Sequence, residues 1–244
     1  MCIILYMDRN VDILIIGAHP DDAEVGCAGT IIKAVKSGLT VGVLDITRGE
    51  AGSRGDIQTR ALEAEASANI LGLKFRDNLC MPDCGLIDSM DGREKIAAKL
   101  RQYRPKIVFS TAPFDRHPDH AAVGDMVKAA FMYSRLKNRE IIDENGQKTV
   151  CHSAERLYFY PMHEVENISF VIDITDVFEG KMEAIKAFSS QFYGKKIDGY
   201  LPIGTDDYPH TIANRAGYFG TFIRKKYGEG FIAASPLILE VDDL

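Results

Sequence analysis

Two short segments of the sequence combine histidine with carboxylate side chains at spacings found in metal sites. The first is His19-Pro20-Asp21-Asp22, and the second is His117-Pro118-Asp119-His120. Imidazole and carboxylate groups are ligands that zinc and similar divalent ions take in proteins. The chain has six histidines, and these two segments hold three of them. We therefore expect both segments to contribute to one metal site.

Three of these side chains suit metal coordination. Catalytic zinc takes three protein ligands and keeps a fourth position for water, whose pKa falls to about 7. His19, Asp22 and His120 can supply the three ligands. The sequence therefore predicts a metal centre with one position open to water.

The other polar side chains of the two segments suit proton transfer. The rigid turn at Pro20 leaves the Asp21 carboxylate free to accept a proton from the bound water. His117, held by Asp119, could be a charged hydrogen-bond donor for a developing oxyanion. Each segment alone could also be a helix cap or a solvated helix start. Together they predict metal-assisted hydrolysis.

Each segment follows an apolar run that is typical of a buried strand, at 13–16 and at 107–110. In open parallel sheets, ligands bind at the carboxyl ends of strands. From residue 11 to about 134, short β-branched runs alternate with stretches of helical period, which is the pattern of βαβ units with right-handed crossovers. We predict a single α/β domain over 1–244: a Rossmann-like three-layer sandwich with a mostly parallel sheet and the metal site at the carboxyl ends of its strands.

The expected elements follow from the same patterns. We predict strands at 13–17, 40–47, near 75, 107–110, 156–160 and 169–173, and helices at 26–37, 56–71, 91–103, from 119, 177–190 and 211–227. The glycine-rich loop 49–55 should border the site, and the loop 193–209 is the candidate for a mobile lid.

Composition excludes several classes of function. The net charge is −6 and no basic run exceeds 224–226, so we expect no nucleic-acid partner. The apolar segment 2–6 is far shorter than the roughly 20 residues of a membrane-spanning helix, so we expect no membrane partner. Five scattered cysteines fit reduced thiols in the cytoplasm, with Cys80 and Cys84 half-buried. We expect residues 1–10 to be a disordered or artefactual extension, with Met7 as the true start.

The segment 18–24, together with 117–120, resembles the LmbE-like, PIG-L superfamily of zinc-dependent N-acetylglucosaminyl deacetylases. The similarity continues through 47–50, 78–83, 190–192 and 227–231. This combination looks most like the bacillithiol-biosynthesis deacetylases, which remove acetyl from N-acetylglucosaminyl-malate. The resemblance implies a cytoplasmic enzyme with one zinc ion per chain, a small amino-sugar substrate and a homo-oligomer, often a hexamer.

The resemblance also implies a role for each site residue. His19, Asp22 and His120 would be the zinc ligands and Asp21 the general base. His117 and Asp119 would stabilise the intermediate and protonate the departing amine. Substrate contacts would come from Glu50, Arg60, Asp83, Arg156 and Tyr208. Arginine suits the carboxylates of malate, and Arg54, Arg60 and Arg156 are available for them.

Two alternatives stay open at the level of sequence. One keeps the metal and changes the substrate, to chito-oligosaccharides or to bacillithiol conjugates. The other is a non-enzymatic nucleotide-binding Rossmann domain, because the glycines of 26–29 begin a helix after the first strand. The full G-x-G-x-x-G pattern is missing.

Overall fold

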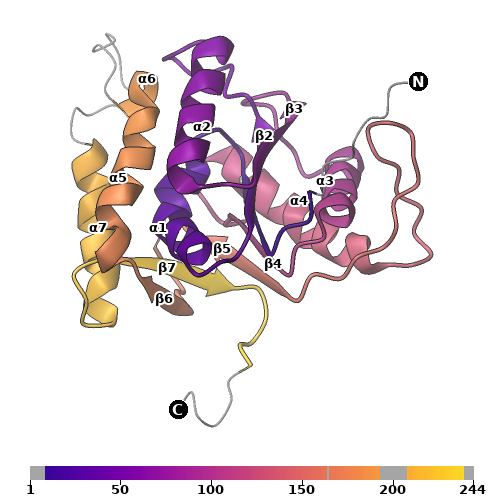
Figure 1. Ribbon diagram of the computed structural model, residues 1–244. Coiled ribbons are helices and arrows are strands. Elements are labelled where there is room, and N and C mark those ends of the chain that lie inside the picture. Colours follow the sequence, from indigo (N-terminus) through magenta and orange to yellow (C-terminus); the bar gives the residue numbers. More distant parts are fainter. Residues whose placement is uncertain (1–8, 164, 193–207, 239–244) are drawn as a thin grey trace.

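The computed structural model describes residues 9–163, 165–192 and 208–238, and its strands form one seven-stranded sheet (Figure 1). The strands are β1 (Ile13–Gly17), β2 (Val41–Thr47), β3 (Phe75–Met81), β4 (Ile107–Thr111), β5 (Arg156–Tyr160), β6 (Phe170–Asp173) and β7 (Gly228–Ala233). The helices are α1 (Asp22–Lys36), α2 (Ile57–Leu71), α3 (Met90–Tyr103), α4 (Pro118–Arg135), α5 (Phe178–Ala187), α6 (Ser189–Phe192) and α7 (Tyr208–Phe222), with a 3-10 turn η1 (Thr175–Val177).

The order of the strands puts a ligand site between β1 and β4. The sheet runs β3-β2-β1-β4-β5-β7-β6, and its first five strands are parallel. The chain builds outward from β1 through β2 to β3 and then returns to place β4 on the other side of β1. Such a switch point leaves a crevice at the carboxyl ends of the two central strands. The predicted α/β fold with a mostly parallel sheet is confirmed.

Helices cover both faces of the sheet and make the molecule three-layered. Helices α3 and α4 lie on one face, and α1, α2, α5 and α7 lie on the other (Figure 1). Successive side chains of a strand point to opposite faces, so Leu14 and Ile16 enter the core under α3 and α4, while Ile13 and Ile15 enter the other core. All four are buried, and each such side chain stabilises the fold by about 1.5–3 kcal/mol relative to exposure.

Some elements differ from their predicted extents. Helix α1 begins at Asp22, four residues earlier than predicted, and is interrupted at Cys27, whose φ of −148° and ψ of 20° are not helical. Strand β7 was not predicted, because its glycines hide the strand pattern. The predicted lid lies outside the described residues except for 208–209, which begin α7. Of the predicted extension, residues 1–8 also lie outside them.

Within the described residues, no helix is both long and apolar enough to cross a bilayer. Cys27, Cys80, Cys84 and Cys151 are free thiols there. Cys80 and Cys84 are exposed, whereas we expected them to be half-buried: Cys80 lies at an irregularity of the edge strand β3 and Cys84 in the turn after it, both with positive φ.

Candidate active site

The three predicted metal ligands meet at the switch point between β1 and β4. His19 and Asp22 come from the loop and first helical turn after β1, and His120 comes from the first turn of α4 after β4. Nε2 of His120 lies 3.2 Å from Oδ1 of Asp22, and Nδ1 of His19 lies 3.7 Å from Oδ2 of Asp22. All three residues are buried, and their ligand atoms lie within 4.8 Å of one another.

The ligand atoms are held so that they face a common point. Oδ2 of Asp22 accepts hydrogen bonds from the backbone N–H groups of Ala18 and His19, at 2.8 and 3.0 Å, which leaves Oδ1 for a cation. Nδ1 of His120 lies 3.1 Å from Oδ1 of Asp115. If Nδ1 donates its proton to that carboxylate, Nε2 is left as a bare lone pair. Metal-binding histidines are held in this way by an outer carboxylate, so the residues fit a divalent cation.

The charges around the two imidazoles also favour a cation. Burial alone would lower the pKa of His19, but hydrogen bonds with Asp119, Asp22 and Asp83 raise it well above 6.5. Burial likewise opposes protonation of His120, but the charge of Asp22 raises its pKa to about 9. Buried carboxylates that draw protons onto buried histidines mark a place where positive charge is stabilised. Metal binding would release those protons.

Asp21 lies beside this cluster in an unusual backbone conformation. Its φ of 128° is rare for a residue with a side chain, and such strain tends to occur at functional positions. Burial raises the pKa of the Asp21 carboxyl to about 7, the charge of Arg60 opposes this, and Asp22 adds to it. A carboxyl group with a pKa near 7 is suited to take up and return a proton at neutral pH.

His117 is the N-cap of α4, and its hydrogen bond defines its tautomer. Nδ1 of His117 accepts a hydrogen bond from the backbone N–H of Asp119, at 3.2 Å, so the neutral ring carries its proton on Nε2. The ring centroid lies 5.0 Å from that of His19 and 4.6 Å from that of His120. Burial and these two neighbouring histidines lower the pKa of His117.

The predicted pairing of His117 with the Asp119 carboxylate is not present. That carboxylate accepts hydrogen bonds from the backbone N–H groups of Cys84, at 2.8 Å, and Leu86, at 3.3 Å, and its Oδ2 lies 3.4 Å from Nε2 of His19. A ring nitrogen of His117 and a carboxylate oxygen of Asp119 nevertheless lie within 4.8 Å of each other, without a hydrogen bond between the two side chains. His117 is therefore a neutral donor here, and the charged donor we expected does not fit.

The cluster opens into a cavity of about 580 Å³. All five parallel strands send the loop at their carboxyl end to its wall. Of the predicted substrate residues, Arg60, Asp83 and Tyr208 line it. Tyr208 stacks on Phe192, with ring centroids 5.3 Å apart. The cavity has the size of a small-molecule site.

Asp83 lines this cavity, and Glu50 holds it through the backbone. Oδ1 of Asp83 lies 3.0 Å from Nε2 of His19, and its Oδ2 accepts a hydrogen bond from the backbone N–H of Ala51. Glu50 does not line the cavity. Its Oε1 accepts a hydrogen bond from the backbone N–H of Asp83, at 3.1 Å. Glu50 therefore connects the loop after β2 to the loop after β3.

Arg60 is buried and braces the loops around Asp21. It donates hydrogen bonds to the backbone oxygens of Gly49 and Pro20, at 2.9 and 2.8 Å, and its Nη2 lies 3.4 Å from Oδ2 of Asp21. A Cβ atom at Gly49 would lie 1.9 Å from Nη1 of Arg60, so only glycine allows this approach.

The structure does not bring Arg156 to the site. It is the first residue of β5 and pairs with Ile107, the first residue of β4, so it stands at the amino ends of the strands. Four further residues at about 3.3 Å each separate it from the carboxyl edge. Its Nη1 donates to the backbone oxygen of Glu155. The predicted substrate contact of Arg156 is therefore wrong for this structure.

Three side chains of the site, Asp115, His163 and Arg116, were not predicted from the sequence, whereas Arg54 was considered for the substrate carboxylates and does line the cavity. Asp115 is buried, and its Oδ1 also lies 2.8 Å from Nδ1 of His163, which follows β5. His163, Arg54 and Arg116 line the cavity. The strand-end rule that identified His19 also applies to His163, so the sequence did hold a signal for it.

Comparison with known proteins was made by sequence and by fold. Residues 14–131 match the PIG-L family, described as GlcNAc-PI de-N-acetylase. The chain is 31% identical over 239 residues to diacetylchitobiose deacetylase from Thermococcus kodakarensis, covering 94% of this chain and 85% of the relative. It is 29% identical over 209 residues to a probable N-acetyl-alpha-D-glucosaminyl L-malate deacetylase 2 from Bacillus anthracis, covering 78% and 85%. The crystal structure of a conserved protein from Thermus thermophilus matches with a TM-score of 0.83 and 35% identity, covering 95% of this chain and 98% of the other.

Proposed function

Because this chain belongs to the PIG-L family of deacetylases, we propose that it hydrolyses the N-acetyl group of an N-acetylglucosamine-type sugar to acetate and a free amine. One observation carries the proposal. His19, Asp22 and His120 converge from two different loops, and Asp21, a partly buried carboxyl with a pKa raised to about 7, lies directly beside them.

The cation that we propose for this site is zinc. His19, Asp22 and His120 would hold it, and their imidazole and carboxylate donors suit that ion. When bound, it would supply Lewis-acid polarisation and lower the pKa of a coordinated water.

Asp21 would perform the proton transfers, and His117 would stabilise the developing negative charge. The Asp21 carboxylate would accept a proton from the attacking water as a bond forms to the acetyl carbon. The Nε2–H group of His117 would donate a hydrogen bond to the carbonyl oxygen as negative charge develops there. When the C–N bond breaks, the proton held by Asp21 would pass to the departing nitrogen, which leaves acetate and the amine.

For the other part of the substrate we propose malate. Arg54 and Arg116 bring positive charge to the cavity, and Arg116 is exposed with no ion pair among the described residues. An arginine fork suits a carboxylate. The Bacillus anthracis relative supports this assignment by its name. Diacetylchitobiose is the second candidate, because the relative that acts on it covers nearly the whole chain.

Substrate assays with the zinc-loaded protein test both the deacetylase activity and the choice of substrate. We would incubate it with N-acetylglucosaminyl-malate and, separately, with diacetylchitobiose, and follow the loss of one acetyl group by mass spectrometry. Acetate release from either substrate supports the deacetylase assignment. A folded, zinc-loaded protein that releases acetate from neither contradicts it.

The variant Arg116→Met tests whether malate is the aglycone, the part of the substrate attached to the sugar. If malate is the natural aglycone, this change should raise KM for the malate substrate by about 10-fold or more, the loss expected for a charged hydrogen bond. The KM for diacetylchitobiose should stay unchanged. Equal KM values for the malate substrate in wild type and variant would contradict the malate assignment.

We also propose that the chain forms a homo-oligomer. Helix α2 exposes Ile57, Leu62 and Ile70, whose exposed fractions are 40%, 62% and 45%. Of these, Leu62 and Ile70 project about 80° apart around the helix axis, and neighbouring exposed apolar side chains favour a protein interface. Light scattering coupled to gel filtration measures the mass directly, and a monomer at micromolar concentration would contradict this proposal.

A further inference from the structure

Helix α1 is interrupted just after the turn that carries the metal ligand Asp22. The break at Cys27 leaves backbone groups on both sides without partners inside the helix. On the far side, the N–H groups of Gly29 and Thr30 donate to the carboxylate of Glu229, at 3.0 and 2.7 Å. The carboxylate thus caps the helix that restarts after the break.

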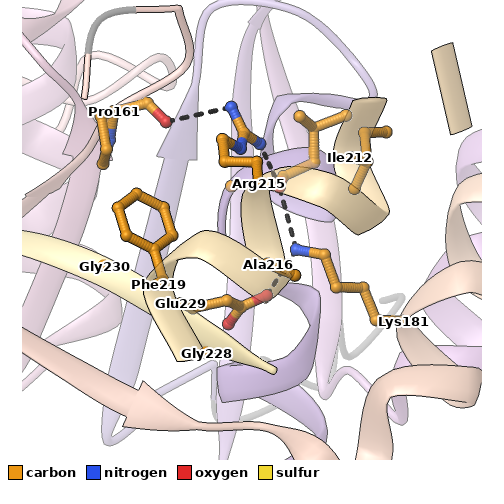
Figure 2. A pocket seen from close by; sticks show the side chains of 11 residues that line it. Pro161, Lys181, Ile212, Arg215, Ala216, Phe219, Gly228, Glu229 and Gly230 are labelled. Atoms are coloured by element: carbon orange, nitrogen blue, oxygen red, sulfur yellow. Dashed lines mark hydrogen bonds and ion pairs between the residues drawn. The ribbon is translucent and has the colours of Figure 1, made fainter. Parts of the chain in front are cut away.

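On the near side, two cations share one backbone oxygen. The oxygen of Val25 accepts hydrogen bonds from Nζ of Lys181, at 2.9 Å, and from Nη2 of Arg215, at 3.0 Å. Lys181 also forms an ion pair with Glu229 at 2.5 Å, as Figure 2 shows. Arg215 has no ion pair among the described residues.

The other nitrogen of Arg215 reaches the loop after β5 (Figure 2). Nη1 donates hydrogen bonds to the backbone oxygen of Met162 and, at 3.4 Å, to that of Pro161. The next residue, His163, donates its backbone N–H to Asp115, at 3.0 Å. Asp115 in turn holds Nδ1 of His120.

The guanidinium of Arg215 is therefore linked, through other residues, to both segments that supply the proposed metal ligands. Through Val25 it holds the short helical segment that carries Asp22. Through Met162 it holds the loop after β5. In that loop His163 contacts Asp115, which holds the ring of His120. Val25 and Met162 also line the substrate cavity.

The chemistry of this position requires arginine. A partly buried guanidinium without a carboxylate partner is unfavourable unless its N–H groups are satisfied, and desolvation lowers the pKa of Arg215. Its fork is rigid and planar, so it can fix the separation between two carbonyl groups. A lysine ammonium is a single point on a flexible stem and cannot span both.

We propose that Arg215 is a positioning residue that sets the distance between the Asp22 segment and the His120 segment of the metal site. The inference rests on the proposed metal-dependent deacetylase function. Arg215 lies two turns after Tyr208 on α7, so the same helix contributes to the wall of the cavity and fixes the ligands.

The test compares two variants of Arg215 with a control on the same helix. Arg215→Met removes both sets of hydrogen bonds, and Arg215→Lys keeps the charge but loses the fork. Ile212→Ala opens a cavity one turn away without touching either carbonyl group. For each protein we would measure zinc affinity by chelator competition, the visible spectrum of the Co²⁺-loaded form, Tm, kcat and KM.

We expect both Arg215 variants to bind zinc about 10- to 100-fold more weakly, the range seen when outer partners of metal ligands are removed. Their Co²⁺ spectra should shift, and kcat should fall while KM stays within about twofold. Ile212→Ala should lower Tm but keep wild-type zinc affinity and spectrum. If Arg215→Met does not fold, Arg215→Lys decides the question.

Two results would overturn the proposal. One is wild-type zinc affinity and an unshifted Co²⁺ spectrum in the folded Arg215 variants. The other is an equal loss of zinc affinity in Ile212→Ala, which would make the effect one of general stability. Because zinc affinity and the spectrum are measured without substrate, they remain informative even if the wild-type protein releases no acetate.

Discussion

Asp115 holds the imidazole of His120 at the nitrogen that does not face Asp22, with Oδ1 3.1 Å from Nδ1 of the ring. This contact directs Nε2 toward Asp22, so the orientation of the proposed metal ligand His120 depends on Asp115. Asp115→Asn removes the negative charge and keeps the shape. We expect zinc affinity to fall about 10- to 100-fold. Chelator competition measures it, and Asp125→Asn, an exposed position on α4, should leave it unchanged. Equal affinities in all three proteins would rule out this role.

The ligand assignment predicts which changes empty the metal site. Asp22→Ala and His120→Ala each remove one of three ligands, so the purified variants should hold little zinc by elemental analysis. His117→Ala lies in the same cluster but removes no assigned ligand and should keep its zinc. A full complement of zinc in Asp22→Ala would show that the ligands have been assigned wrongly.

Replacing the proposed base should separate chemistry from metal binding. Asp21→Asn should retain zinc and lose about 10²- to 10⁴-fold in kcat, the usual worth of general acid–base catalysis. The amide cannot accept the proton of water. Steady-state kinetics with matched zinc content checks this, and near-normal kcat would remove Asp21 from the role.

His117→Ala tests stabilisation of the developing oxyanion. The variant should lose about 2.7–4 kcal/mol of transition-state stabilisation, seen as a fall in kcat of about 10²- to 10³-fold with KM little changed. Substrate titration separates the two constants. A rise in KM alone would instead make His117 a ground-state binding residue.

Asp12 should make the fold sensitive to acid. Hydrogen bonds from the backbone N–H of Thr40 and from Lys106 lower the pKa of Asp12 from 3.8 to about 2. A depressed pKa means that the stabilisation is complete above pH 4 and is lost as pH falls from about 4 to 2. Asp12→Asn should reduce the free energy of unfolding by about 1–2 kcal/mol at pH 7, after allowance for partial exposure.

Urea unfolding at pH 7 and at pH 3 measures this effect, and the gap between wild type and Asp12→Asn should narrow at the lower pH. Asp91→Asn is the control, because the Asp91 side chain is 69% exposed and its pair with Lys95 lies on the helix surface. A gap that stays constant with pH would show that Asp12 acts through its shape alone.

The fold and the convergence of His19, Asp22 and His120 could be predicted from the sequence because both follow from local patterns. The runs at β1 and β4 are short, apolar and followed by chemistry-bearing residues, so strand type and strand end were both visible. The relatives are named as deacetylases, which goes against the non-enzymatic nucleotide-binding alternative.

Features that depend on side-chain direction or distant partners could not be read in this way. Spacing placed His117 and Asp119 together, but it could not show that the Asp119 carboxylate accepts its hydrogen bonds from the backbone of Cys84 and Leu86. His163 meets Asp115 across 48 residues, and no local pattern signals that contact. Arg156 was placed by resemblance alone, and only the strand register shows that it stands at the wrong edge.

The backbone of Asp21 implies a trade-off between function and folding. A non-glycine residue at φ of 128° raises the energy of the native state by about 1–3 kcal/mol, and the buried carboxyl adds a desolvation penalty. Asp21→Gly would relieve the backbone strain and remove the partly buried carboxyl. The inactive variant should therefore have a higher Tm than the active protein. The active protein is thus less stable than it would be without the strained residue at position 21.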